Sequence, residues 1–116
     1  MKFFSEETLK ACRFVDINDI IGGQTAKTDA GKPRLTLVPL EILYDVARVR
    51  EYAVNNKYHD PGNWKQVSVE RYRDAAFRHL CAYLRDPDGV DDESGLPHLW
   101  HLATNIAFLC ELEKGE

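Results

Sequence analysis

The chain lacks long hydrophobic runs and any excess of basic residues. No stretch approaches the roughly 20 apolar residues that a transmembrane helix needs, and residues 1–7 contain no apolar core long enough for a signal peptide. Its 15 Lys and Arg against 19 Asp and Glu give a net charge of −4, which argues against general nucleic-acid binding. These absences predict a cytoplasmic protein without a membrane or general nucleic-acid partner, but they leave open a small anionic ligand held by a local basic cluster.

Cysteine is also scarce. The three residues Cys12, Cys81 and Cys110 form neither a CxxC motif nor a zinc-binding spacing. Cys81 and Cys110 stand among apolar residues of expected helices, so we interpret them as small buried hydrophobes in a reducing compartment. The composition is otherwise ordinary, with 44% hydrophobic and 29% charged residues, and a length of 116 residues predicts one domain with a modest core.

Apolar residues at helical spacing predict a short helix over residues 5–15 and three long helices. The first long helix starts at Pro39 and fades near residue 55, the second follows a Ser68 cap and runs to Arg85, and the third has Ser94 or Gly95 as its cap and ends near Leu112. Between the short helix and the first long one, Gly and Pro punctuate a polar loop over residues 22–37.

The expected buried face of the first long helix consists of Ile42, Leu43, Val46, Val49 and Ala53. The expected buried face of the second long helix consists of Tyr72, Ala76, Leu80, Tyr83 and Leu84. Helices this amphipathic must pack on one another. The prediction is an all-α, single-domain small bundle completed by oligomerisation, with an N-terminal helix and mobile loop over residues 1–37 and a helical core over residues 38–112.

Three polar residues of the last helix, His98, His101 and Asn105, form an i, i+3, i+7 stripe inside its apolar arc. The arc consists of Leu99, Leu102, Ala103, Ile106, Leu109, Cys110 and Leu112, and Thr104 and Glu111 are expected to point away from it. Polar groups on a buried face are costly unless they are paired. The stripe therefore indicates either a metal or polar ligand inside the bundle, or histidines bonded to neighbouring groups.

The second long helix adds His79 and two arginines, Arg71 and Arg78, which are seven residues apart and project together. Guanidinium groups bind phosphate oxygens bidentately, so the pair suits a phosphate. The alternative is a solvated face with ion pairs to Glu70 or Asp74.

The turn before the last helix is acidic. Asp91, Asp92 and Glu93 offer the oxygen ligands that Mg²⁺ or Mn²⁺ prefers, one turn or less from His98. The free N–H groups of the following helix favour a bound anion. The alternative is that the acidic residues only compensate the helix dipole.

Residues outside these helices carry weaker signals. Lys32 and Arg34 could close over phosphates from the loop, and Tyr58 and Trp64 could stack on a nucleobase. The simpler interpretations are an exposed loop for the first pair and core or hinge packing for the second. Together with the clusters above, they favour a nucleotide as the ligand.

Four segments resemble a known family: GKPRLTLVP (31–39), KYHDPGNW (57–64), RYRDAAFRHLCAYLR (71–85) and DDESGLPHLWHLATNIAFL (91–109). The family consists of small phage and prophage proteins of the dATP/dGTP diphosphohydrolase type, near the MazG-like all-α pyrophosphohydrolases. The resemblance implies a homodimer or homotetramer in the host cytoplasm that cleaves a purine (deoxy)nucleoside triphosphate to monophosphate and pyrophosphate with Mg²⁺ or Mn²⁺.

Carried onto this chain, the resemblance assigns metal ligands, catalytic groups and phosphate-binding residues, and base-binding residues complete the predicted site. The metal ligands would be Asp91, Glu93, His98 and His101, and the catalytic groups Glu93, His98 and His79. Phosphates would be held by Arg71, Arg78, Lys32 and Arg34, and the base by Tyr58, Trp64 and Asn105. MazG-like enzymes usually carry Glu-x-x-Glu and Glu-x-x-Asp pairs, which the long helices here lack, so the implied metal site is histidine-rich.

Two other functions use the same residues. A phage protein that sequesters a nucleotide without turnover would need the basic and aromatic residues, but its acidic turn would be structural. A helical interaction module would bond the polar stripe internally and bind no small ligand. Metal-dependent hydrolysis is the leading hypothesis because it accounts for carboxylates, histidines and arginines together.

Overall fold

The computed structural model describes residues 30–114, and the chain divides into two compact units, Met1–Val38 and Pro39–Glu116. The expected helix over residues 5–15 and the first part of the expected loop lie outside the described residues. In the first unit the described segment consists of a turn, an irregular stretch that carries Lys32 and Arg34, and one turn of 3-10 helix, η1 (Leu35–Leu37). All of its side chains are exposed.

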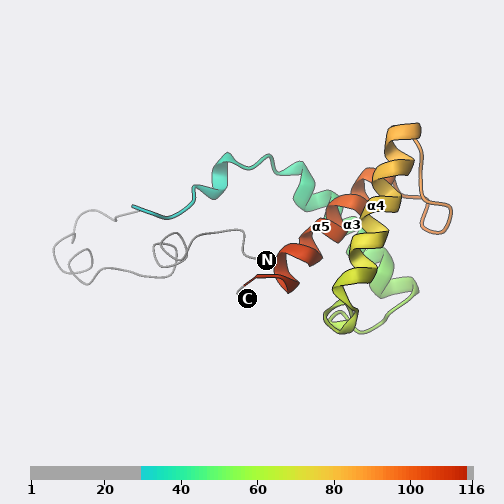
Figure 1. Ribbon diagram of the computed structural model, residues 1–116, viewed down its shortest axis with the longest axis horizontal. Coiled ribbons are helices and arrows are strands. Elements are labelled where there is room, and N and C mark those ends of the chain that lie inside the picture. The colour runs from blue at the N-terminus through green and yellow to red at the C-terminus, as the bar shows by residue number, and fades with distance from the viewer. Residues whose placement is uncertain (1–29, 115–116) are drawn as a thin grey trace. The chain divides into compact units, whose positions relative to one another are not determined.

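The second unit contains three α-helices, α3 (Glu41–Asn56), α4 (Val69–Arg85) and α5 (His98–Leu112), with the 3-10 turn η2 (Asn63–Gln66) between α3 and α4 (Figure 1). Residues 30–114 include no strand, only an isolated antiparallel bridge between Val90 and Pro97. The all-α prediction is therefore confirmed. None of the described helices is long and apolar enough to cross a membrane.

The helix ends agree with the sequence except at two starts. Ser68 is the N-cap residue of α4 as predicted, although its side chain makes no capping bond. α3 begins at Glu41 rather than at Pro39. α5 begins at His98, with Pro97 as N-cap, instead of after Ser94 or Gly95, because those residues close the preceding turn.

Helix α5 is the centre of the unit, since it packs against both α4 and α3. It turns a partly polar side toward them: Thr104 and Asn105 are buried, and Thr104 is only 3% exposed. The prediction that Thr104 points away was wrong. Its hydroxyl donates to the carbonyl of Trp100, 2.9 Å away, which removes the cost of burying it.

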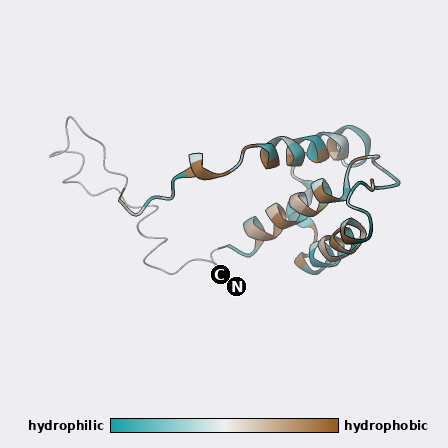
Figure 2. Ribbon diagram, turned by 90° about the horizontal axis from the view of Figure 1, so that it is seen from above, coloured by the Kyte–Doolittle hydropathy of each residue, from teal (hydrophilic) through white to brown (hydrophobic). Residues whose placement is uncertain are grey.

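Much of the expected apolar core is exposed. Among the described residues only Val49, Tyr72 and Ala76 are buried apolar side chains. The predicted core residues that are exposed instead are Ile42, Leu43, Leu80, Leu84, Leu99, Ile106 and Cys110. Figure 2 shows apolar residues along the whole of α5. Three helices cannot cover every apolar face, because α5 has one side against α3 and α4 and leaves the other uncovered.

Candidate functional site: a histidine–carboxylate cluster in a polar cavity

The connection between α4 and α5 is a closed turn that carries Asp91. The amide of Asp91 donates to the carbonyl of Leu96 and the amide of Gly95 to the carbonyl of Asp91, both at 2.8 Å. Gly95 has a φ of 73°, a left-handed conformation that glycine adopts without strain. Because the turn closes, the start of α5 lies beside Asp91 and its carboxylate can reach the same point as His98.

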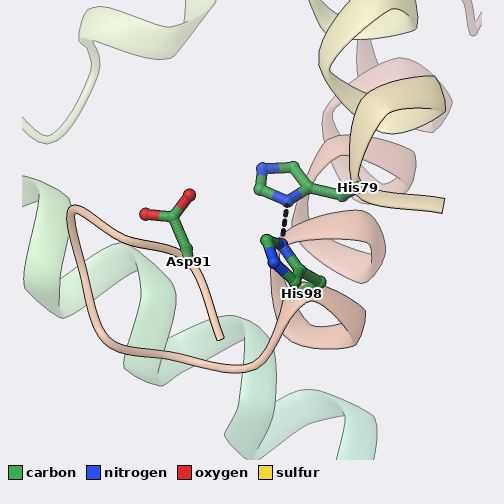
Figure 3. Close-up of side chains that lie close together, drawn as sticks. All are labelled: His79, Asp91 and His98. Atoms are coloured by element: carbon green, nitrogen blue, oxygen red, sulfur yellow. Dashed lines mark hydrogen bonds between the residues drawn. The ribbon is translucent and has the colours of Figure 1, made fainter. Parts of the chain in front are cut away.

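Three donors meet at this point. One atom each of His79 on α4, Asp91 in the turn and His98 at the start of α5 all lie within 4.8 Å of one another (Figure 3). The Nδ1 atoms of His79 and His98 are 3.0 Å apart, which is within hydrogen-bond distance. The arrangement brings two imidazoles and one carboxylate to one place, which is the donor set of a metal site.

His101 lies beside this cluster and has its own partner. Its ring stacks on that of His79, with centroids 4.7 Å apart, and its Nε2 is 2.7 Å from the hydroxyl oxygen of Ser94. Ser94 Oγ also accepts a bond from the amide of Leu96, so the turn fixes the serine and the serine fixes His101. His101 is therefore held in one orientation, one ring away from the three donors.

Burial sets the charge of these groups. It lowers the pKa of His79 to about 4, with the nearby His101 as the second cause, and it also lowers the pKa of His101. Burial alone would raise the pKa of Asp91, but the amides of Ser94 and Glu93, which donate to its carboxylate, hold that pKa below its ordinary value. At neutral pH the imidazoles of His79 and His101 are neutral and Asp91 is ionised. For His79 and Asp91, which belong to the cluster, these are the forms that coordinate a metal.

These shifts predict a loss of stability in acid. The pKa of His79 falls from 6.5 when unfolded to about 4 when folded, so between these values the unfolded chain binds the extra proton. The free energy of unfolding of the metal-free protein should therefore fall as the pH drops from 6.5 to 4. We expect His79→Gln to remove on the order of 1–2 kcal/mol of this fall, reduced for solvent screening. Urea denaturation in EDTA at pH 6.5 and at pH 4 measures the free energy of unfolding of the wild type and of His79→Gln. An equal fall of this free energy in the two proteins would contradict the prediction.

A second group of side chains is aromatic. The rings of Trp64 and Phe108 stack with centroids 4.9 Å apart, and Tyr72 packs on Phe108 at 4.8 Å while its hydroxyl donates to the carbonyl of Trp64 at 2.7 Å. The guanidinium of Arg50 covers Phe108 at 5.3 Å from the ring centroid. This stack joins η2 to α3, α4 and α5.

A cavity of about 450 Å³ connects the aromatic stack to the histidines. Most of the predicted site residues line it: Tyr58, Trp64, Arg71, Arg78, His79, Asp91, Glu93, His101 and Asn105. A second hollow of about 460 Å³ adjoins it and adds His98. Within residues 30–114, neither Arg71 nor Arg78 has an ion-pair partner; Glu70 pairs with Arg73 instead. The expected alternative of arginines neutralised by Glu70 or Asp74 is therefore absent from this part of the chain.

Some predicted residues take other positions. Lys32 and Arg34 belong to the first unit and stay predictions. Glu93 lies outside the three-donor cluster and forms an ion pair with Lys57 at 3.0 Å. His101 also lies outside it, next to Ser94. The roles assigned to all these residues remain predictions.

Three further residues of the site are not marked by any pattern in the sequence. Lys57 lines both hollows, Phe108 lies at the centre of the aromatic stack, and Ser94, considered only as a helix cap, orients His101. Each depends on a contact between residues at least seven positions apart, which no local pattern reveals. Only the basic character of Lys57, next to Tyr58 in a turn, offered a weak signal.

The fold and the cavity define an all-helical protein with a histidine–carboxylate cluster at one end of an aromatic and basic hollow. The family model described as dATP/dGTP diphosphohydrolase, N-terminal, matches residues 22–116, and the chain belongs to this family. A protein of Salmonella phage PMBT28 named dATP/dGTP diphosphohydrolase is 35% identical over 83 residues. The match covers 72% of this chain but only 28% of that relative. No solved structure matches the chain.

Proposed function

We propose that the chain binds a purine (deoxy)nucleoside triphosphate in this cavity and hydrolyses it to the monophosphate and pyrophosphate. The observation that carries the proposal is the convergence of His79, Asp91 and His98 at one end of a hollow lined by Arg71 and Arg78. Family membership and the printed name of the phage relative support a nucleotide as the ligand.

The cavity suits a nucleotide along its whole length. The guanidiniums of Arg71 and Arg78, which have no ion-pair partner within residues 30–114, are suited to phosphate oxygens. The aromatic end, with Tyr58 half exposed, offers a surface for a base. Asn105 donates to the carbonyl of His101 at 2.8 Å and lines the same cavity, and we assign its amide oxygen to base recognition. We assign the phosphates to the histidine end and the base to the aromatic end.

The donor set fits a divalent metal held by His79, Asp91 and His98. Imidazole ligands suit transition metals better than Mg²⁺, so we propose Mn²⁺ rather than Mg²⁺ from the two expected ions. When bound, the metal would neutralise phosphate charge and acidify a water molecule.

The remaining residues perform the other steps. Arg71 and Arg78 orient the phosphates, and Glu93 accepts the proton of the attacking water. The water oxygen forms a bond to the α-phosphorus, the bond from the α-phosphorus to the bridging oxygen breaks, and pyrophosphate leaves with that electron pair.

A product assay tests the proposal. Purified protein is incubated with each common dNTP and NTP in Mn²⁺, Mg²⁺ or EDTA, and the products are separated by chromatography. We expect monophosphate and pyrophosphate from dATP or dGTP, faster with Mn²⁺ and absent in EDTA.

Arg78→Ala should lower kcat/KM by about 10- to 100-fold, because it removes a charge-assisted contact to phosphate.

Two outcomes would overturn the hydrolase proposal. Nucleotide recovered intact, together with ligand-induced thermal stabilisation, would establish binding without turnover. The absence of both turnover and stabilisation would favour a helical interaction module.

We also propose that the chain assembles as a homodimer or homotetramer. Large apolar side chains on all three helices are exposed, including Leu43, Leu84 and Ile106. Large apolar side chains exposed in this number are typical of a protein–protein interface.

A further inference from the structure

The ion pair between Lys57 and Glu93 stands at the rim of the histidine cluster. Lys57 is the C-cap residue of α3, and Glu93 lies in the turn before α5. Their Nζ and Oε1 atoms are 3.0 Å apart, and both side chains line the two hollows together with Arg78. The pair therefore places one cation and one anion where the proposed function places the phosphates.

Lys57 is held in position independently of Glu93. Its Nζ lies 5.2 Å from the ring centroid of Tyr58, a cation–π contact that remains when the carboxylate moves. The hydrogen bond that Lys57 donates to Glu93 also raises the pKa of Lys57, so the ammonium is charged throughout the neutral range. A fixed, charged ammonium at a cavity wall is a suitable ligand for an anion.

Glu93 can leave without disturbing the turn. Its backbone is bonded separately: the carbonyl accepts from the hydroxyl of Tyr52 at 3.1 Å, and the amide donates to Asp91 at 3.1 Å. Its side chain is 60% exposed, so a rotation away from Lys57 moves the carboxylate into water rather than into the protein. Exposed ion pairs contribute little to stability, so the bond to Lys57 opposes this rotation of Glu93 only weakly.

We propose that Lys57 is a phosphate ligand. Without a ligand, the Glu93 carboxylate occupies the position of the phosphate on the Lys57 ammonium, and a bound phosphate displaces this carboxylate. A polyphosphate carries more charge than one carboxylate and forms more hydrogen bonds, so it wins the competition for the ammonium. Displacement also frees Glu93 beside the cluster, where the proposed function needs a proton acceptor. This inference rests on the proposed function, because it names where the phosphates lie.

The test is the binding of pyrophosphate in EDTA at low salt, measured by isothermal titration calorimetry. Lys57→Gln should weaken binding about tenfold, and Lys57→Arg, which keeps the charge, should retain most of it. Glu93→Gln should tighten binding about two- to fivefold, because it removes the competing carboxylate. Glu93→Gln should also abolish turnover, so its affinity and its activity change in opposite directions.

Matched controls come from α4. Glu70→Gln alters another exposed glutamate that pairs with an arginine, at 3.2 Å from Arg73, and Arg85→Gln removes a charge that lines neither hollow. Both should bind pyrophosphate as the wild type does, with circular dichroism confirming the fold of every variant.

Several results would overturn the inference: no binding of pyrophosphate by the wild type, wild-type affinity in Lys57→Gln, or unchanged or weaker affinity in Glu93→Gln. Failure of the proposed function is distinguishable from these. Binding that depends on Lys57 without any nucleotide turnover would leave the anion site in place and remove only the hydrolase.

Discussion

Replacing His98 by alanine is expected to lower the affinity for Mn²⁺ by at least about 100-fold and to remove nucleotide turnover with it. The variant loses one of three donors and also the contact at 3.0 Å that positions His79. Calorimetric titration with Mn²⁺ measures the first effect and the product assay the second.

The chain contains its own control for this substitution. His59, a histidine that lines neither hollow, is exposed and has its Nδ1 2.9 Å from the carbonyl of Val54. His59→Ala should bind Mn²⁺ and turn over nucleotide as the wild type does. If His98→Ala binds the metal as tightly as His59→Ala, the cluster of His79, Asp91 and His98 does not hold it.

Replacing Phe108 by alanine is expected to cost about 2–4 kcal/mol of the free energy of unfolding, somewhat less than for a fully buried ring. The ring contacts Trp64, Tyr72 and Arg50, which come from three different segments. Its loss leaves a gap where η2, α3 and α4 meet α5. Urea denaturation followed by circular dichroism gives the difference.

Phe77 on α4 is the matched control, because it is the same residue type but 69% exposed. Phe77→Ala should change the free energy of unfolding by about 0.5 kcal/mol or less. Equal losses of free energy of unfolding in the two variants would show that Phe108 in the aromatic stack stabilises the unit no more than an exposed phenylalanine does.

The candidate site shows which features a local sequence pattern can predict. The i, i+3, i+7 spacing of His98, His101 and Asn105 correctly placed these residues on one side of a helix, and the seven-residue spacing of Arg71 and Arg78 placed both arginines along one cavity. Spacing could not separate the roles of His98 and His101, because the closed turn brings Asp91 to one and Ser94 to the other.

The limited reach of local spacing also explains why several residues predicted to be buried are exposed. Apolar periodicity predicted faces for all three helices, but the buried apolar residues of the described chain are Val49 on α3 and Tyr72 and Ala76 on α4. On α5 the buried residues are the polar Thr104 and Asn105. Periodicity does not reveal how many neighbours a helix has. Leu80, Leu84, Leu99 and Ile106 are therefore exposed although they follow the same helical pattern.

The sequence by itself determined the all-α class, the ends of α4, the end of α5 and the family, because helical spacing, caps and family motifs are local properties of the chain. Only the tertiary structure decided which donors meet. The cluster of His79, Asp91 and His98 depends on the crossing of α4 and α5 and on a turn that closes through Gly95. The pairing of Lys57 with Glu93 joins residues 36 positions apart, and such contacts arise from packing, which local spacing does not specify.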